Sequence, residues 1–384
     1  MGETTSSGFH TFENTAADAV SAIQYDAGGD RIVTASADHR LRIYQKSCVD
    51  SNDWELYDQW RGHDAEVKWI DSSHGEVLTT IGGDNKFKVW QENPSQAHTR
   101  GRRFKCIFSQ TPVDSVAYIA FDYIVRQQDI YVALISHTGL FTLLEPADPT
   151  TLSSWREGDA FYPFGQQPRS SEARFSISFH HAAGPNSQAL RAGIDKSSIS
   201  LAISSASQVN VYRFANPEDE NVALQEVLRM PFEDGLVCSV AWAPAHPQPE
   251  DVVAVACDDG KIRMLEITVQ TSSQNLLTSN GHSNLSALRR GSRNDQQLGR
   301  SGIAAGLANI DRPREVSQSE QGNGPKHEGK IVAELQTSEG ASAHQMEWTM
   351  DGCTLVTTGD DGKAHLWKRS LAGNWMQYAE TAFQ

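Results

Sequence analysis

The chain lacks long hydrophobic runs, abundant cysteine and an excess of positive charge. None of its apolar stretches reaches the roughly 18 residues of a membrane-spanning helix, and its first residues lack the apolar region of a secretion signal. Its five cysteines are odd in number and scattered, which indicates reduced thiols in a cytosolic or nuclear compartment. The 33 Lys and Arg are outnumbered by 48 Asp and Glu, for a net charge of −15, so we expect neither nucleic-acid binding nor membrane insertion.

Motifs of catalysis and metal binding are also missing. The sequence has no Gly-rich phosphate loop, His-Glu-x-x-His, Cys-x-x-Cys or Gly-x-Ser-x-Gly. The acidic pairs at 258–259 and 360–361 could be taken for catalytic carboxylates. Each pair precedes Gly-Lys at a predicted tight turn, however, where Asp caps its own backbone. We therefore expect no enzyme activity, no cofactor and no metal site.

What the sequence does contain is a cassette that recurs six times. Each copy runs apolar strand, Gly- or Asp-rich turn, β-branched run, tight turn and alternating strand, most clearly at residues 20–44 and 344–367. The tight turn before the third strand falls at Asp38, Asp84, Thr138, Ala206, Asp259 and Asp361. Four short strands per repeat predict an all-β, six-bladed propeller. Such a fold builds a binding surface more often than an active site.

A fourth, outer strand is expected in each blade. The predicted segments are 54–60, 104–109, 160–164, 224–230, 330–336 and 375–381, of which the third has the weakest pattern. The long spacers at 146–171 and 182–198 have the composition of surface loops.

Residues 271–327 interrupt the repeat inside blade five. This segment is rich in Ser, Asn, Gln, Gly and Arg and has no Phe, Trp or Tyr, so it cannot bury enough apolar surface to offset its backbone entropy. We predict a disordered inserted loop. Ser292 follows a basic tract within it and is a candidate phosphorylation site, with a chance match as the alternative. The predicted organisation is an N-terminal segment, 1–19, and a single propeller domain, 20–384.

The strand count predicts a ring that need not close. Blades one and six each have four strands of their own, and the stretch before Val20 alternates too little to be a good strand for the last blade. An open propeller exposes apolar faces and strand edges, which another chain can complete in trans. The candidate contact residues are Phe12, Val20, Ile23 and Tyr25. The alternative is that loops or an N-terminal strand close the ring in cis and that these side chains are ordinary core.

Blade two carries a set of residues like that of WD repeats. His63 precedes its first strand, Asp84 occupies its tight turn and Trp90 ends its third strand. The imidazole, the carboxylate and the indole N–H can join one buried polar network. The other blades lack the full set.

Several segments, in order and spacing, resemble a known family over nearly the whole chain. They include DWELYDQWRGHDAEV, SVAWAPAHPQPEDVVAVACDDGKIRMLEI and GDDGKAHLWK. The family is that of the Seh-type propeller nucleoporins, related to the Sec-type coat propeller. The entry to blade two and the strands of blade three depart from the family pattern.

The resemblance implies a non-enzymatic scaffold subunit of the Y-shaped subcomplex of the nuclear pore, at the nuclear envelope. Its partners would be an α-solenoid nucleoporin that donates a β-blade and the other Y-complex nucleoporins, in support of nucleocytoplasmic transport. It also implies a second role at the vacuolar membrane, in a coat-like complex that regulates TOR signalling. The alternatives are a Sec-type vesicle-coat propeller and a WD-repeat adaptor that recognises peptides.

Overall fold

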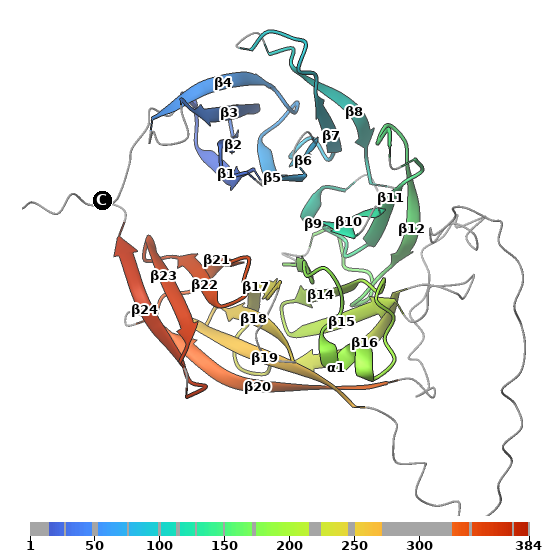
Figure 1. The fold of residues 1–384 in the computed structure, drawn as a ribbon, viewed down its shortest axis with the longest axis vertical. Helices are drawn as coiled ribbons and strands as arrows, with labels where there is room; N and C mark the ends of the chain where they lie inside the picture. The colour runs from blue at the N-terminus through green and yellow to red at the C-terminus, as the bar shows by residue number, and fades with distance from the viewer. Residues whose placement is uncertain are drawn as a thin grey trace, which may run out of the picture.

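Each sequence cassette folds into one antiparallel sheet, and the sheets stand side by side in a ring (Figure 1). The computed structural model describes residues 15–26, 28–47, 53–74, 77–98, 101–112, 116–126, 129–148, 150–170, 174–214, 224–244, 250–270, 325–337, 340–370 and 372–382. Within these residues the chain is all-β apart from one short helix, and it forms six four-stranded sheets. In every sheet the strands lie in chain order from the centre of the ring to its rim.

The first three blades follow one another around the ring. Blade one consists of β1 (Val20–Tyr25), β2 (Arg31–Ser36), β3 (Arg40–Lys46) and β4 (Trp54–Arg61). Blade two consists of β5 (Val67–His74), β6 (Val77–Gly82), β7 (Phe87–Glu92) and β8 (Phe104–Gln110). Blade three consists of β9 (Tyr118–Arg126), β10 (Asp129–Ser136), β11 (Phe141–Pro146) and β12 (Trp155–Phe161).

The last three blades continue in the same direction. Blade four consists of β13 (Ser176–Phe179), β14 (Ser200–Ser205), β15 (Gln208–Phe214) and β16 (Leu224–Pro231). Blade five consists of β17 (Val237–Trp242), β18 (Asp251–Cys257), β19 (Lys261–Gln270) and β20 (Lys326–Gln336). Blade six consists of β21 (Ala343–Trp348), β22 (Thr354–Gly359), β23 (Lys363–Arg369) and β24 (Trp375–Ala382). The six aligned turns all lie between the second and third strands, as predicted.

Two local predictions were wrong in detail. The outer strand of blade three is β12, which begins five residues before the predicted start at Ala160, because Trp155 packs against Phe108 of blade two with ring centroids 6.0 Å apart. The spacer at 182–198 contains the helix α1 (Ser187–Arg191), whose first turn is capped where Asn186 accepts the amide N–H of Ala189 at 2.7 Å. Among the described residues, no helix is long and apolar enough to cross a membrane.

The inserted loop is shorter than predicted at its C-terminal end. Strand β20 begins at Lys326, so Lys326 and His327 are not loop residues but pair with Gln270 and Val269 of β19. The strand extends there because β19 is itself ten residues long and offers a ladder to pair with. Residues 271–324 lie outside the described part of the chain.

The apolar core lies between the blades rather than within one layer. Five clusters fill the interfaces from blade one–two to blade five–six. At the first interface Trp60 stacks on Phe104 at 4.5 Å and meets Trp90 edge-on at 5.8 Å. In the part of the chain that the structure describes, no cluster joins blade six to blade one. The ring therefore has five filled interfaces and one seam.

Candidate functional site

The seam lies between β1 and β21, the innermost strands of the first and last blades. Inner strands of successive blades contact one another from β1 to β21, but β21 makes no comparable contact with β1. No described strand of blade six pairs with one of blade one, and Figure 1 shows the two blades standing apart. The predicted absence of strand exchange between the first and last blades therefore holds for the described strands.

The blade-one wall of the seam is the face of β1–β4 turned away from blade two. Ile23 and Tyr25 alternate along β1 with Ala22, which packs against the core shared with blade two. They therefore lie on the opposite face, where they are 62% and 57% exposed. The Tyr25 ring packs edge-on against the Trp54 ring, with the ring centroids 6.0 Å apart. They are the most exposed large apolar side chains on any innermost strand among the described residues, ahead of Trp69 of β5 and Val125 of β9, which are 40% and 37% exposed.

The remaining two candidate contact residues stand differently. Val20 is half-buried and lies at an irregularity in the β1–β2 register, which shifts between Val20 and Ala22. Phe12 lies outside the described residues. The structure thus places Ile23 and Tyr25 together on the open face, with Val20 beside them at the end of the strand.

The blade-six wall is the face of β21–β24 turned away from blade five. Trp348 and Trp367 pack into the core shared with blade five. Val356 and Leu366, which are cross-strand partners, alternate with these core positions and are only partly buried. By contrast, all seven residues of β18 in blade five are buried, because that sheet has a neighbour on both faces.

The apolar wall of blade six continues onto its outer strand. Met376 and Tyr378 of β24 are 52% and 68% exposed. The ammonium of Lys368 lies 4.6 Å from the centre of the Tyr378 ring. These residues were not singled out from the sequence, although the alternation of 375–381 pointed to a half-buried strand. Exposed apolar side chains therefore lie on both walls of the seam.

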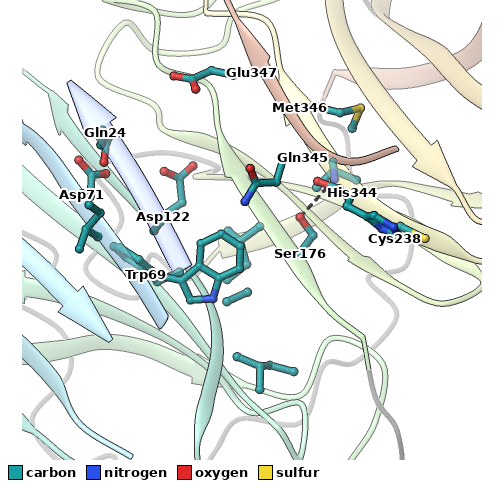
Figure 2. Close-up of a pocket in the computed structure, with 18 of the residues that line it drawn as sticks. Gln24, Trp69, Asp71, Asp122, Ser176, Cys238, His344, Gln345, Met346 and Glu347 are labelled. Atoms are coloured by element: carbon teal, nitrogen blue, oxygen red, sulfur yellow. Dashed lines mark hydrogen bonds between the residues drawn. The ribbon is translucent and has the colours of Figure 1, made fainter. Parts of the chain in front are cut away.

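A cavity of about 650 Å³ runs through the centre of the ring and receives side chains from both walls of the seam. Figure 2 shows Asp71, Asp122, Gln345 and Glu347 around this space. Asp122 is already engaged structurally, because its carboxylate accepts the amide N–H of Phe179 at 2.5 Å in the next blade. Among the described residues no group of three or more side chains is placed to hold a metal ion.

The residues of the WD-like set come together in blade two. His63 Nδ1 lies 2.8 Å from Asp84 Oδ1, and His63 Nε2 lies 2.8 Å from Thr80 Oγ1. The indole N–H of Trp90 donates to the same hydroxyl at 2.9 Å. Burial lowers the pKa of His63, against the pull of the Asp84 carboxylate, so the imidazole is neutral near pH 7.

Two residues of this network were missed from the sequence. Thr80 links the network, because its hydroxyl bonds to both His63 and Trp90. In the sequence it looks like any β-branched residue in the middle of a strand. Gly82 provides the space, since a Cβ there would sit 2.3 Å from His63 Nδ1 and 2.7 Å from Asp84 Oδ1. Only glycine allows the backbone so close to the imidazole.

The turn aspartates of four blades share a second feature that the sequence analysis missed. Each pairs with a basic residue or histidine four positions later, and the bond bridges the turn to the third strand. The pairs are Asp38–Arg42, Asp84–Lys88, Asp259–Arg263 and Asp361–His365. The predicted turn-capping role also holds, because Asp259 and Asp361 accept the N–H of Lys261 and Lys363.

Arg103 lies in a short basic segment, 100–103, but it is not a solvated surface charge. This side chain is buried and its Nε lies 2.5 Å from Glu92 Oε1. Glu92 also binds Arg31 at 2.7 Å, so the ions join blade one to blade two. Ser292 lies outside the described residues.

Six four-stranded blades around a channel, together with the His63–Thr80–Trp90 network, define this chain as a WD-repeat β-propeller. The family model described as "WD domain, G-beta repeat" (WD40) matches residues 8–45, around blade one. A WD-repeat propeller of this kind is a structural scaffold and not an enzyme.

The sequence is similar over most of its length to proteins named SEH1. Nucleoporin SEH1 of Saccharomyces cerevisiae is 24% identical, with 95% of this chain and 96% of that protein covered. Nucleoporin SEH1 of Chaetomium thermophilum is 23% identical, with 67% and 64% covered. Protein SEH1 of Arabidopsis thaliana is 22% identical, with 92% and 93% covered. The chain has homologues of this name in fungi and a plant, consistent with a Seh-type WD-repeat nucleoporin.

Proposed function

We propose that this chain is a structural scaffold subunit of the nuclear pore complex, in its Y-shaped outer-ring subcomplex at the nuclear envelope. Its main ligand is an α-solenoid nucleoporin that donates a β-sheet to the seam, and other Y-complex nucleoporins join the assembly. The observation that carries the proposal is a seam without an apolar core between two walls that expose Ile23, Tyr25, Met376 and Tyr378. The names of the relatives support the location.

The physical role of the partner is to fill the seam, where a donated sheet would form two new interfaces, one with blade one and one with blade six. A donated sheet would bury apolar side chains on both walls at once, each worth about 1.5–3 kcal/mol when fully removed from water. Strand addition to a sheet edge satisfies backbone groups at the same time. A closed disc fixed to a solenoid rod is a rigid unit, suited to building a scaffold that supports nucleocytoplasmic transport.

The proposal is tested by affinity purification of the tagged full-length chain from nuclear-envelope extracts. We expect one stoichiometric α-solenoid nucleoporin, together with other members of the outer-ring subcomplex. Ile23→Asp and Tyr378→Asp should each weaken recovery of that partner about tenfold or more, because about 1.4 kcal/mol of lost burial corresponds to a factor of ten.

A matched control is Met350→Asp, because Met350 is 90% exposed on the turn between β21 and β22, outside the two walls. This variant should recover the partner at the level of the unmodified chain. Equal recovery with all three variants would contradict a role for the seam. A vesicle-coat rod as the stoichiometric partner would favour the Sec-type alternative, and substoichiometric clients would favour a peptide-recognition adaptor.

A second role at the vacuolar membrane, in a coat-like complex that regulates TOR signalling, stays a prediction from the resemblance. The same seam could hold a different solenoid there, so the two roles would compete for one surface. Purification from vacuolar membranes in place of nuclear envelopes tests it.

A further inference from the structure

Every blade carries one β-bulge at the same place in its outer strand. In each sheet the pairing between the third and fourth strands shifts once, and the shift leaves one extra residue on the outer strand. These bulge residues are Tyr57, Ile107, Gly158, Val227, Val332 and Tyr378. Tyr57, Ile107 and Val227 pack against the cores that join their blades to the next blade. By the same geometry, Tyr378 of the last blade faces the seam.

In blade one the bulge tyrosine and a neighbouring cation hold a carboxylate of the next blade. The Arg31 guanidinium lies 4.7 Å from the centre of the Tyr57 ring. The Tyr57 hydroxyl donates to Glu92 Oε1 at 3.2 Å, and Arg31 Nη1 donates to Glu92 Oε2 at 2.7 Å. Burial alone would raise the pKa of Glu92, but hydrogen bonds from Arg103 and Arg31 keep it below its ordinary value. The carboxylate is therefore ionised, and the two side chains clamp it across the interface.

Blade six carries the same two kinds of group on its seam face. The Lys368 ammonium lies 4.6 Å from the centre of the Tyr378 ring, which is the separation that Arg31 has from the bulge tyrosine of blade one to within 0.1 Å. Lys368 pairs across the strands with Thr354, and Arg31 pairs with Gln45 at the matching place in blade one. Cross-strand partners share a face, so both cations lie on the face of the bulge residue. Among the described residues, Lys368 forms no ion pair and the Tyr378 hydroxyl no hydrogen bond.

The environment of a bulge residue depends on the group that the next blade places at the position of Glu92. Glu92 lies two residues after the register shift of its third strand, and the same count gives Ile267 in blade five and Arg369 in blade six. Val227 packs into the core that contains Ile267. Val332, whose counterpart is Arg369, is instead 36% exposed. A bulge residue is therefore packed where the next blade offers matching chemistry and exposed where it does not.

We propose that Lys368 and Tyr378 bind an Asp or Glu side chain of the donated sheet, held as Glu92 is held in blade two. An ammonium only donates hydrogen bonds and a phenol hydroxyl can donate one, so a single ionised carboxylate satisfies both groups. The inference rests on the proposed function and adds the chemistry of the partner. It places a carboxylate on the third strand of the donated sheet, counted from the channel.

Paired substitutions in blades one and six distinguish the internal clamp from the proposed one. Tyr57→Phe and Arg31→Met each remove a donor from Glu92 and should lower the melting temperature of the free chain. Tyr378→Phe and Lys368→Met should leave that melting temperature unchanged, because their carboxylate belongs to another chain. The probe for binding is the α-solenoid nucleoporin that co-purifies with the full chain, prepared in recombinant form. The two blade-six variants should each bind it about tenfold more weakly, as expected for a lost hydrogen bond to a charged group.

The sign of the charge identifies the bound group as a carboxylate. Lys368→Glu should weaken binding further than Lys368→Met, because it sets a negative charge against the carboxylate of the partner. The affinity of Lys368→Met should also depend less on salt than that of Tyr378→Phe, because only the former loses the charge. The matched control is Lys330→Met on the exposed outer strand of blade five, outside the seam, which should bind like the unmodified chain.

Two results would overturn the clamp while the scaffold function stands. One is a complex that forms with unchanged affinity in Tyr378→Phe and Lys368→Glu. The other is a fall in the melting temperature of the free chain with Tyr378→Phe or Lys368→Met, since this chain would then supply the carboxylate itself. If no α-solenoid nucleoporin is recovered with the unmodified chain, the scaffold proposal falls and the clamp falls with it.

Discussion

Lowering the pH from 7 to 4 should destabilise this protein through one partly buried histidine, His327. His327 is the second residue of β20, and its Nε2 is buried without a hydrogen-bond partner. Burial lowers its pKa from the ordinary 6.5 to about 4, and the nearby positive charge of Arg213 adds to the effect. A backbone hydrogen bond to Pro325 and the Asp251 carboxylate oppose it.

The sign follows from which form of the imidazole the fold prefers. The folded chain holds His327 neutral down to about pH 4, whereas in the unfolded chain it takes up a proton near pH 6.5. Its contribution to stability is therefore fully present above pH 6.5 and is lost as the pH falls to 4. Each pH unit between the two pKa values is worth about 1.4 kcal/mol, so the loss is roughly 3 kcal/mol.

His327→Gln separates this effect from the titration of other groups. We expect urea denaturation to give an unfolding free energy for each protein at pH 7 and at pH 4. Between these pH values the variant should gain roughly 3 kcal/mol relative to the unmodified chain. The imidazole carbon resonances of His327 should titrate near pH 4. A resonance that titrates near 6.5, or a free-energy difference independent of pH, would refute the burial of the His327 ring nitrogen.

The polar network of blade two allows two further tests by thermal and urea unfolding. Thr80→Val should cost about 1–3 kcal/mol, because it leaves Trp90 and His63 without their shared partner. The control is Thr34→Val at the matching position of blade one, where the threonine hydroxyl is buried without a hydrogen-bond partner. This variant should therefore be neutral or stabilising. Equal losses of stability in both variants would contradict a specific network. Gly82→Ala should also destabilise the chain, by pushing a methyl group into the imidazole, and an unchanged melting temperature would argue against the close approach.

Much of the ring could be predicted from the sequence because its determinants are local. The period-2 alternation and the turn residues at Asp38, Asp84 and Asp361 each act within a few positions, so the six cassettes follow from the chain itself. Among the described strands, the absence of a strand shared between the first and last blades follows from the same count. Burial, by contrast, depends on neighbours, and the sequence did not show that Arg103 would be enclosed by Glu92.

The errors lie where a neighbouring element overrides a local pattern. Trp155 joins a strand because Phe108 of another blade offers it a surface, and His327 joins one because β19 continues far enough to pair with it. Neither contact is visible within a short window of sequence. The same holds for Thr80, whose role as a hub exists only after three strands and a loop have met.

The amino-acid sequence by itself determined the strand period, the number of blades and the lack of catalytic motifs, because these depend on residue types at short spacing. Only the tertiary structure decided which faces of those blades stay open. Whether Ile23 or Tyr378 is core or interface depends on a neighbour more than a hundred positions away or on another chain altogether, and a short-range pattern carries no information about either.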